Sequence, residues 1–205
     1  MDKNYRVILF DLDGVIVDTK RNMEISWATV RAVFEIDTPF ERYFELIGIP
    51  FDEIVVRLGL GKLATEIRMV YNLASSCRVD LVSPYSGCVE VIKKIRRRGL
   101  RTGIVTSKDE ARTLEIIRRL DLLFDVVECP DGRGRGKPSP DPLLHALIKC
   151  QMDPVEAVYI GDMGVDEECA RRAGIDYIHA GWGYGKCESE AKKAARPEDI
   201  LTLIF

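Results

Sequence analysis

The sequence is poor in the residues that build zinc sites, and it has no long apolar segment. It contains only two histidines, His145 and His179, and none of its six cysteines forms a CxxC pair. Zinc sites use clustered cysteine and histidine ligands, so a zinc protein is not expected. The N-terminal apolar run extends only from Val7 to Phe10, which is too short for a signal peptide or a membrane span. These absences favour a cytoplasmic protein with reduced thiols and no membrane partner.

The chain also lacks a strong excess of charge of either sign. Its 30 Lys and Arg residues and 33 Asp and Glu residues give a formal net charge of −3. Proteins that bind nucleic acids usually carry a basic patch or stripe, so no nucleic-acid partner is expected. With 205 residues, the chain can form one hydrophobic core domain that carries a smaller insertion.

Short apolar runs alternate with helical patterns over most of the chain. The runs that favour strands cover residues 5–10, 102–106, 125–128, 157–160 and 175–178. The helical patterns cover residues 87–98, 109–120, 141–149 and 165–173. Strands that alternate with helices of about 10 to 15 residues are typical of βαβ units. The sequence therefore predicts an α/β, Rossmann-like fold, with a parallel sheet flanked by helices on both faces.

One long segment breaks this alternation. Between residues 16 and 82 the apolar residues recur at helical spacing, and Pro39, Pro50 and Gly59 punctuate the segment. We interpret it as a small α-helical cap domain inserted after the first strand. The predicted core domain then comprises residues 1–15 and 83–205, and the predicted cap domain comprises residues 16–82.

Two acidic residues directly follow the first predicted strand. Asp11 and Asp13 are two residues apart, so in an extended segment their side chains point the same way. Buried acids are unfavourable unless they bind or react with something. Gly14 would permit a sharp turn out of the sheet. Aspartate also caps helices and starts turns, so the pair alone leaves a purely structural role open.

Three further groups of polar residues follow other predicted strands. Thr106 and Ser107 could seat an anion at a strand-to-helix turn, or they could simply cap the next helix. Lys137 lies between a glycine turn and two prolines, in a loop where a lone lysine is usually a surface residue. Asp162 and Asp166 are spaced to share one face at a helix start, where carboxylates also serve as caps.

These groups should meet, because parallel sheets place their ligands at the carboxyl ends of the strands. Carboxylates gathered there would repel each other without a cation, and a ligand set made only of oxygens suits Mg²⁺. Thr106, Ser107 and Lys137 would add donors for a phosphate dianion. In such a site one aspartate can attack phosphorus as a nucleophile while another moves the proton.

The motifs, in their order, also resemble those of a known family. DLDGVIVDT after the first strand, then TSK, GKPSPD and GDMGVDEECARRAG, resemble the motifs of the haloacid dehalogenase-like (HAD) hydrolase superfamily. The position of the predicted cap is similar to that in the phosphoglycolate-phosphatase-like branch, whose helical cap follows the first motif. The resemblance spans almost the whole chain and implies a HAD-type core with a helical cap.

The resemblance implies a metal site and two catalytic acids. Asp11 matches the nucleophile, and Asp13 matches the general acid/base, whose backbone carbonyl also binds magnesium. Asp162 matches the direct metal ligand, and Asp166 matches the supporting carboxylate of the same loop. The implied cofactor is Mg²⁺, held at a site to which all four aspartates belong.

Residues for phosphate binding and substrate recognition complete the expected site. Thr106, with Ser107 beside it, matches the phosphate-binding hydroxyl of the family. Lys137 matches the catalytic lysine that steadies the nucleophile and the phosphate. In the predicted cap, Arg21 and Gly48 are our candidates for contact with the substrate's leaving group.

The expected enzyme is a magnesium-dependent phosphatase that hydrolyses a small phosphorylated metabolite through a phospho-aspartyl intermediate on Asp11. The alternative is a phosphomutase on the same scaffold, similar to β-phosphoglucomutase, which returns the phosphate to a bound sugar. A dehalogenase is disfavoured, because family dehalogenases generally lack the second acid, which is Asp13 here. The sequence leaves the substrate open, and the protein can be a monomer or a homodimer.

Overall fold

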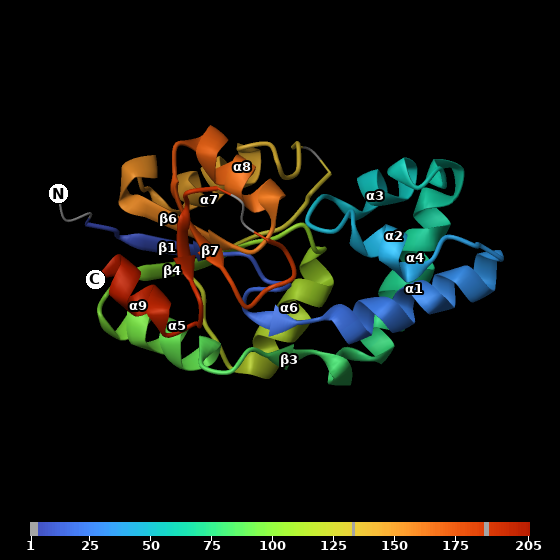
Figure 1. The fold of residues 1–205 in the computed structure, drawn as a ribbon, viewed down its shortest axis with the longest axis horizontal. Helices are drawn as coiled ribbons and strands as arrows, with labels where there is room; N and C mark the ends of the chain where they lie inside the picture. The colour runs from blue at the N-terminus through green and yellow to red at the C-terminus, as the bar shows by residue number, and fades with distance from the viewer. Residues whose placement is uncertain (1–3, 133, 187–188) are drawn as a thin grey trace.

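A computed structural model describes residues 4–132, 134–186 and 189–205. Within this part of the chain, a six-stranded sheet has the order β5-β4-β1-β6-β7-β8, and its neighbouring strands pair in parallel. The strands are β1 (Val7–Phe10), β4 (Arg101–Val105), β5 (Val126–Glu128), β6 (Ala157–Gly161), β7 (Asp176–Ala180) and β8 (Lys192–Ala194). The sheet confirms the predicted α/β architecture (Figure 1).

Helices cover both faces of this sheet, as Figure 1 shows. One face packs against α5 (Cys88–Arg97), α6 (Glu110–Leu120) and α9 (Asp199–Ile204), and the other against α7 (Asp141–Cys150) and α8 (Gly164–Ala173). Successive side chains of a strand point to opposite faces. Ile8 and Phe10 of β1 accordingly join the first core cluster, and Val7 and Leu9 join the second.

A helical insertion follows β1 and lies beside one end of the sheet (Figure 1). Its elements are α1 (Lys20–Phe34), α2 (Phe40–Phe44), α3 (Phe51–Arg57), α4 (Ala64–Cys77) and the 3₁₀ turns Gly61–Leu63 and Val79–Leu81. The insertion has its own core, in which the rings of Trp27 and Tyr43 stack at a centroid distance of 4.7 Å. The short strands β2 (Val17–Asp18) and β3 (Ser83–Pro84) pair antiparallel where the chain enters and leaves it. We call this insertion the cap.

Strand β1 lies in the interior of the sheet and has a neighbouring strand on each side. It pairs with β4 on one side and with β6 on the other. After β5 the chain crosses back to form β6 on the other side of β1, so the order of the strands switches at β1. Ligands of open α/β sheets bind at the carboxyl ends of the strands beside such a switch. The fold therefore places Asp11, the residue after β1, at the expected binding position.

Two elements outside the cap, β8 and α9, were not expected from the sequence. Strand β8 has the sequence Lys-Lys-Ala, which lacks an apolar alternation, and α9 is only 6 residues long. Both owe their place to packing, because Ala194, Ile200 and Ile204 are buried in the core cluster. Among the described residues, no helix is long and apolar enough to cross a membrane. The described cysteines are free thiols, and Cys187 lies outside the described residues.

Candidate active site

Asp11 continues the sheet by one residue beyond β1. Its backbone N–H donates to the carbonyl of Ile160 at 2.8 Å, which holds the residue beside the end of β6. The side chain is buried, with only 4% of the residue exposed. Its Oδ1 accepts a bond from the Leu12 N–H at 2.8 Å, and its Oδ2 lies 3.2 Å from the Lys137 ammonium. Burial raises the pKa of Asp11 to about 7, although the charge of Lys137 opposes this.

Lys137 is a buried cation between two carboxylates. It is 1% exposed, and its Nζ donates to Asp166 Oδ1 at 2.6 Å and to the Tyr159 hydroxyl at 3.1 Å. Burial alone would lower the pKa of Lys137, but Asp11 and Asp166 together raise it above its usual value. From the sequence, Lys137 could be either a surface residue or a catalytic residue. The structure places it in the buried site. Tyr159, on β6, is a site residue that the sequence analysis did not identify.

Asp162 and Asp166 lie at the end of β6 and in the first turn of α8. Oδ2 of Asp166 accepts the backbone N–H groups of Asp162 at 3.2 Å and Met163 at 3.0 Å, which fixes the loop between them. Oδ2 of Asp162 accepts the N–H of Tyr184 at 2.7 Å. Both carboxylates are fully buried. The carboxylate of Asp166 thus fixes the loop between the two acids, and the carboxylate of Asp162 lies beside Asp11.

The three acids lie close enough together to be able to bind a metal ion. One carboxylate oxygen from each of Asp11, Asp162 and Asp166 can be chosen so that all three lie within 4.8 Å of one another. In the part of the chain that the structure describes, Asp162 Oδ1 is buried and has no hydrogen-bond partner. Burial and the nearby Asp166 and Asp11 raise the pKa of Asp162 well above its usual value. A buried carboxylate oxygen without a partner, close to two other carboxylates, suits Mg²⁺, which prefers oxygen ligands.

The carboxylate of Asp13 has other partners than this cluster. Its Oδ1 accepts a bond from the Thr19 hydroxyl at 2.5 Å and lies 3.2 Å from the Lys108 ammonium. Gly14 then turns the chain with φ of +83°, and a Cβ at this position would lie 2.3 Å from Asp162 Oδ2. Only glycine fits both the backbone conformation and the contact. The two acids of the first motif therefore have separate surroundings, and only Asp11 joins the three-carboxylate cluster.

The predicted phosphate-binding residues lie at the start of the α6 region. Thr106 is buried, and its hydroxyl accepts the N–H of Lys108 at 3.2 Å. The Ser107 hydroxyl donates to the carbonyl of Gly48 at 2.7 Å, so the cap loop touches the core at this point. A cavity of about 60 Å³ between the cap and the core is lined by Asp11, Thr106, Ser107 and Gly48 among others. These four predicted residues are thus brought together.

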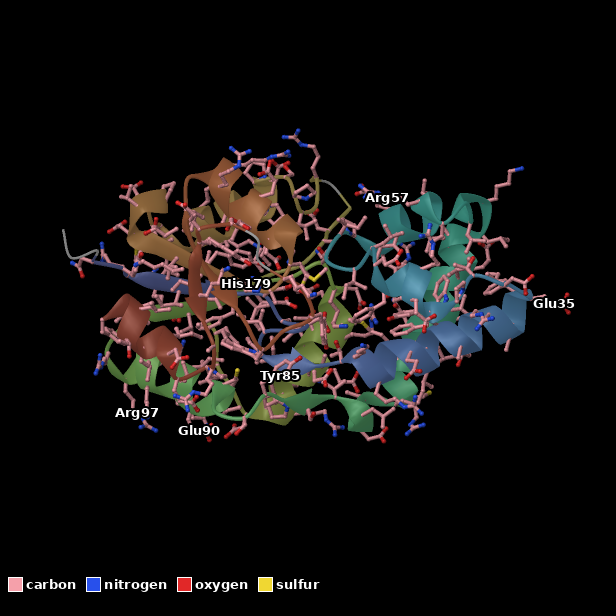
Figure 2. All side chains as sticks on the ribbon, in the orientation of Figure 1. Glu35, Arg57, Tyr85, Glu90, Arg97 and His179 are labelled. Atoms are coloured by element: carbon pink, nitrogen blue, oxygen red, sulfur yellow. The ribbon has the colours of Figure 1, made fainter. Side chains whose placement is uncertain are left out.

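Arg21 is not brought to this cavity. Its side chain is 66% exposed and pairs with Glu24 one turn along α1, with an N–O distance of 2.5 Å. Other basic residues of the cap behave in the same way, and Figure 2 shows Arg57, which pairs with Glu53 at 2.6 Å. His179 lies within the core (Figure 2), where its Nδ1 is 3.3 Å from the Tyr177 hydroxyl.

Comparison of the sequence with known protein families agrees with the arrangement of these side chains. Residues 8–180 match the family described as haloacid dehalogenase-like hydrolase. The chain belongs to this family. The matched range includes Asp11, the cap and the strands through β7, so it covers the predicted site residues from Asp11 to Asp166.

Curated relatives resemble this haloacid dehalogenase-like hydrolase at similar levels of identity. Tyrosine-protein kinase PtkA of Mycobacterium tuberculosis is 29% identical over 189 residues, which are 89% of this chain and 64% of that protein. The chain thus spans less than two thirds of PtkA. Phosphoglycolate phosphatase of Aquifex aeolicus is 29% identical over 209 residues, which are 97% of this chain and 96% of that protein. Because a kinase and a phosphatase match at the same identity, the reaction must be argued from the site.

A solved structure has the same fold along almost its whole length. The protein from Lactobacillus plantarum, provisionally named a phosphoglycolate phosphatase, gives a TM-score of 0.88 at 25% identity. The superposition covers 97% of this chain and 99% of that one. The cap and the core of this HAD-like hydrolase therefore have a close structural counterpart.

Besides Tyr159, three residues of this HAD-like hydrolase contact the site but were not identified from the sequence. Lys108 and Arg112 line the cavity between cap and core, and both are 8% exposed. The hydroxyl of Tyr184 accepts the N–H of Thr19 at 2.6 Å and donates to Asp18 Oδ1 at 2.9 Å. The only sequence signal was position, since Lys108 follows Ser107 directly and Tyr184 lies in a glycine-rich loop after β7. Their partners come from distant segments, which a sequence pattern does not show.

Proposed function

We propose that this HAD-like hydrolase removes phosphate from a small phosphomonoester, with Mg²⁺ and through a phospho-aspartyl intermediate on Asp11. The observation that carries the proposal is the buried Asp11 carboxylate at the end of β1, 3.2 Å from Lys137 and clustered with Asp162 and Asp166. A carboxylate held in this way can attack a phosphoryl group whose charge is neutralised by neighbouring cations. The similarity to the phosphoglycolate phosphatase of Aquifex aeolicus supports the same class of reaction.

The proposed reaction has two displacements at phosphorus. An oxygen of Asp11 attacks phosphorus, and the bond to the leaving-group oxygen breaks while Asp13 gives that oxygen a proton. The first product leaves as an alcohol. A water molecule then attacks the phosphoryl group on Asp11, and Asp13 takes the proton from this water. Inorganic phosphate leaves, and both aspartates return to their starting states.

Each remaining residue has a defined part in this proposal. Lys137 balances the charge of Asp11, and its position leaves it able to contact a phosphoryl oxygen. Thr106 lies at the end of β4 and offers its hydroxyl and the following N–H groups to the phosphate. Asp11, Asp162 and the backbone carbonyl of Asp13 would hold Mg²⁺, and Asp166 braces the Asp162 loop. When bound, the ion supplies positive charge beside the phosphoryl oxygens.

The test is a phosphate-release assay of the purified chain with Mg²⁺ and a panel of phosphomonoesters. Release of inorganic phosphate without a bisphosphate activator is expected, which separates hydrolysis from a phosphomutase reaction. Asp11→Asn is nearly isosteric but has a poor nucleophile, so it should lose turnover while keeping its thermal unfolding curve. Reduction with borohydride during turnover should modify Asp11 in the parent protein. The proposal is wrong if Asp11→Asn, free of deamidation, stays within about tenfold of the parent.

A further inference from the structure

The loop after β7 is a glycine-rich segment that packs directly against Asp162. A Cβ added at Gly183 would lie 2.3 Å from Asp162 Cβ, and one at Gly185 would lie 2.2 Å from the Asp162 carbonyl oxygen. Between these two glycines, the backbone N–H of Tyr184 donates to Asp162 Oδ2 at 2.7 Å. The loop and the acid are thus in contact at three successive residues, so a displacement of the loop would also displace the Asp162 carboxylate.

The hydroxyl of Tyr184 contacts the beginning of the cap. It accepts the backbone N–H of Thr19 at 2.6 Å and donates to Asp18 Oδ1 at 2.9 Å. Thr19 is fully buried and directly precedes α1, the first helix of the cap. The N–H groups at the start of a helix have no partner within the helix. The phenol therefore satisfies a donor that would otherwise be buried without a partner, which is unfavourable.

The ring of Tyr184 contacts the cap at a second point. It meets the ring of Phe44 in α2 edge to face, with a centroid distance of 5.3 Å. In the described chain, three hydrophobic residues from outside the cap pack against the cap's own core, and they are Met163, Val165 and Tyr184. Met163 directly follows Asp162, and Val165 lies two residues further on. The hydrophobic surface that receives the cap is therefore formed by the two segments that hold Asp162.

We infer that Tyr184 is a positioning residue that couples cation binding at Asp162 to the docking of the cap. The inference rests on the metal site of the proposed function. The backbone of Tyr184 holds an oxygen of the proposed metal ligand, while its hydroxyl and ring hold the start of α1 and the helix α2. A cation that fixes Asp162 also fixes the loop on which the cap docks. By linkage, cation binding and cap docking then strengthen each other by the same factor.

A purely structural role for Tyr184 leads to a different expectation. Loss of its hydroxyl would leave the buried Thr19 N–H without a partner and would lower the Tm equally with and without Mg²⁺. Coupling predicts instead that the increase in Tm caused by Mg²⁺ becomes smaller. The decisive quantity is therefore the effect of Mg²⁺ on each variant, and not the stability of the variant.

The first measurement is amide hydrogen exchange of the purified parent protein, in MgCl₂ and in EDTA. We expect Mg²⁺ to slow exchange by about fivefold or more in the first turn of α1 and in α2, since coupling between two sites typically reaches this size. The last turn of α5 is the internal reference, because it ends at Arg97, on the side of the molecule away from the cap (Figure 2). Exchange there should change by less than about twofold.

The second measurement is the Kd for Mg²⁺, obtained from the Mg²⁺ dependence of the Tm. Tyr184→Phe keeps the ring and the backbone N–H but loses the hydroxyl, and it should raise this Kd by about fivefold or more. Tyr184→Leu also loses the ring contact with Phe44 and should raise the Kd further. Tyr5→Phe is the matched control, because the buried Tyr5 donates its hydroxyl to Asp176 but precedes β1, at the opposite end of that strand from Asp11. It should lower the Tm and leave the Kd unchanged.

The exchange comparison on the parent needs no substitution, so it holds even if a Tyr184 variant does not fold. Unchanged exchange in α1 and α2 on addition of Mg²⁺ would overturn the inference. A folded Tyr184→Phe whose Kd for Mg²⁺ stays within about twofold of the parent would overturn it as well. Phosphate release decides the proposed function separately. Protection of the cap by Mg²⁺ without turnover supports the inference while the phosphatase proposal fails, and turnover without this protection refutes the inference alone.

Discussion

At the scale of single residues, Asp11 and Asp13 show how two acids of one short motif acquire different chemistry. Asp11 is enclosed by the sheet and faces Lys137, whereas Asp13 lies in the next turn and faces Thr19 and Lys108. A nucleophile benefits from a fixed position and a cation that keeps it ionised. In the proposed reaction Asp13 is the general acid, which needs access to the leaving group, and Asp13 lines the cavity that this group would enter.

Asp13→Asn is expected to slow the reaction through lost proton transfer, which typically contributes about 10² to 10⁴ in rate. The loss should be smaller with p-nitrophenyl phosphate, because its leaving group needs no proton. The measurement is kcat for this ester and for an alkyl phosphate, with parent and variant side by side. Equal losses on both esters would mean that Asp13 only shapes the metal site.

Asp162 offers the most direct test of the metal site, because its Oδ1 is buried without a partner in the described chain. Chelation should stop activity, Mg²⁺ should restore it, and Ca²⁺ should support it poorly because it favours larger coordination shells. Mg²⁺ should also raise the Tm of the parent, since an ion that binds only the folded state stabilises it. Asp162→Ala should lose this Tm shift. Full activity in excess chelator would contradict the metal assignment.

The sequence predicted the polar side chains that the fold brings together beside β1 better than the side chains that line the cavity between cap and core. Asp11, Asp162 and Lys137 were found because each follows a strand whose carboxyl end the fold brings to one edge. Arg112, which lines the cavity, was not identified, because the residues that it contacts in the cap, Ser75 and Tyr71, are far away in sequence. Arg21 was proposed for its charge and place in the chain, yet its helix face directs it to Glu24.

At the scale of elements, the cap helices α1 and α4 are joined by a buried polar bridge. Asn22 is 2% exposed, and its amide donates to the carbonyls of Ser75 at 2.9 Å and Arg78 at 2.8 Å. Its Oδ1 accepts the Ser75 hydroxyl at 2.7 Å. The amide thereby satisfies carbonyls at the end of α4, which a helix leaves without internal partners. The same Ser75 hydroxyl contacts Arg112, so the bridge extends to the core.

Asn22→Ala should destabilise the cap by about 1–3 kcal/mol, because several buried polar groups lose their partners. Amide hydrogen exchange should rise at the C-terminal turn of α4 more than in the strands of the core. Thr29→Ala is the control, since the Thr29 hydroxyl on the same helix only bonds the Ile25 carbonyl of its own helix. That change should stay within about 0.5 kcal/mol. An unchanged exchange rate at α4 in Asn22→Ala would show that the bridge contributes little.

Elements with a clear hydrophobic period were predictable, and those held by tertiary contacts were not. Strand β1 is apolar throughout and lies at the centre of the sheet. Strand β8 contains two exposed lysines and buries only Ala194, so nothing in its own sequence indicates a strand. The pair β2 and β3 is too short for any period, and Tyr85, directly after β3, lies where the core meets the cap (Figure 2). The predicted boundaries of the two domains, at residues 15/16 and 82/83, remain predictions.

At the scale of the whole molecule, function depends on how the cap sits on the core. The loop after α2 touches the core where the Gly48 carbonyl accepts the Ser107 hydroxyl at 2.7 Å. Gly48 has φ of +95°, and a Cβ there would lie 2.7 Å from Val165 Cγ2 of α8. The loop therefore approaches two core segments, and glycine permits both the backbone conformation and the close contact.

Gly48→Ala should show whether the position of the cap on the core controls catalysis independently of protein stability. The Cβ would push the loop away from Val165, and a misplacement of about 1 Å can cost about a hundredfold in rate.

Gly59→Ala is the matched control, because Gly59 also lies in the cap with φ of +79° but has no atom within 4 Å of the added Cβ. Both substitutions place a side chain in the left-handed region, which costs roughly 1–2 kcal/mol of folding free energy in each case. We expect similar losses of Tm, a fall of about ten- to a hundredfold in kcat/KM for Gly48→Ala, and a change below about threefold for Gly59→Ala. Equal kinetics in the two variants would mean that the contact of the Gly48 loop with the core does not control catalysis.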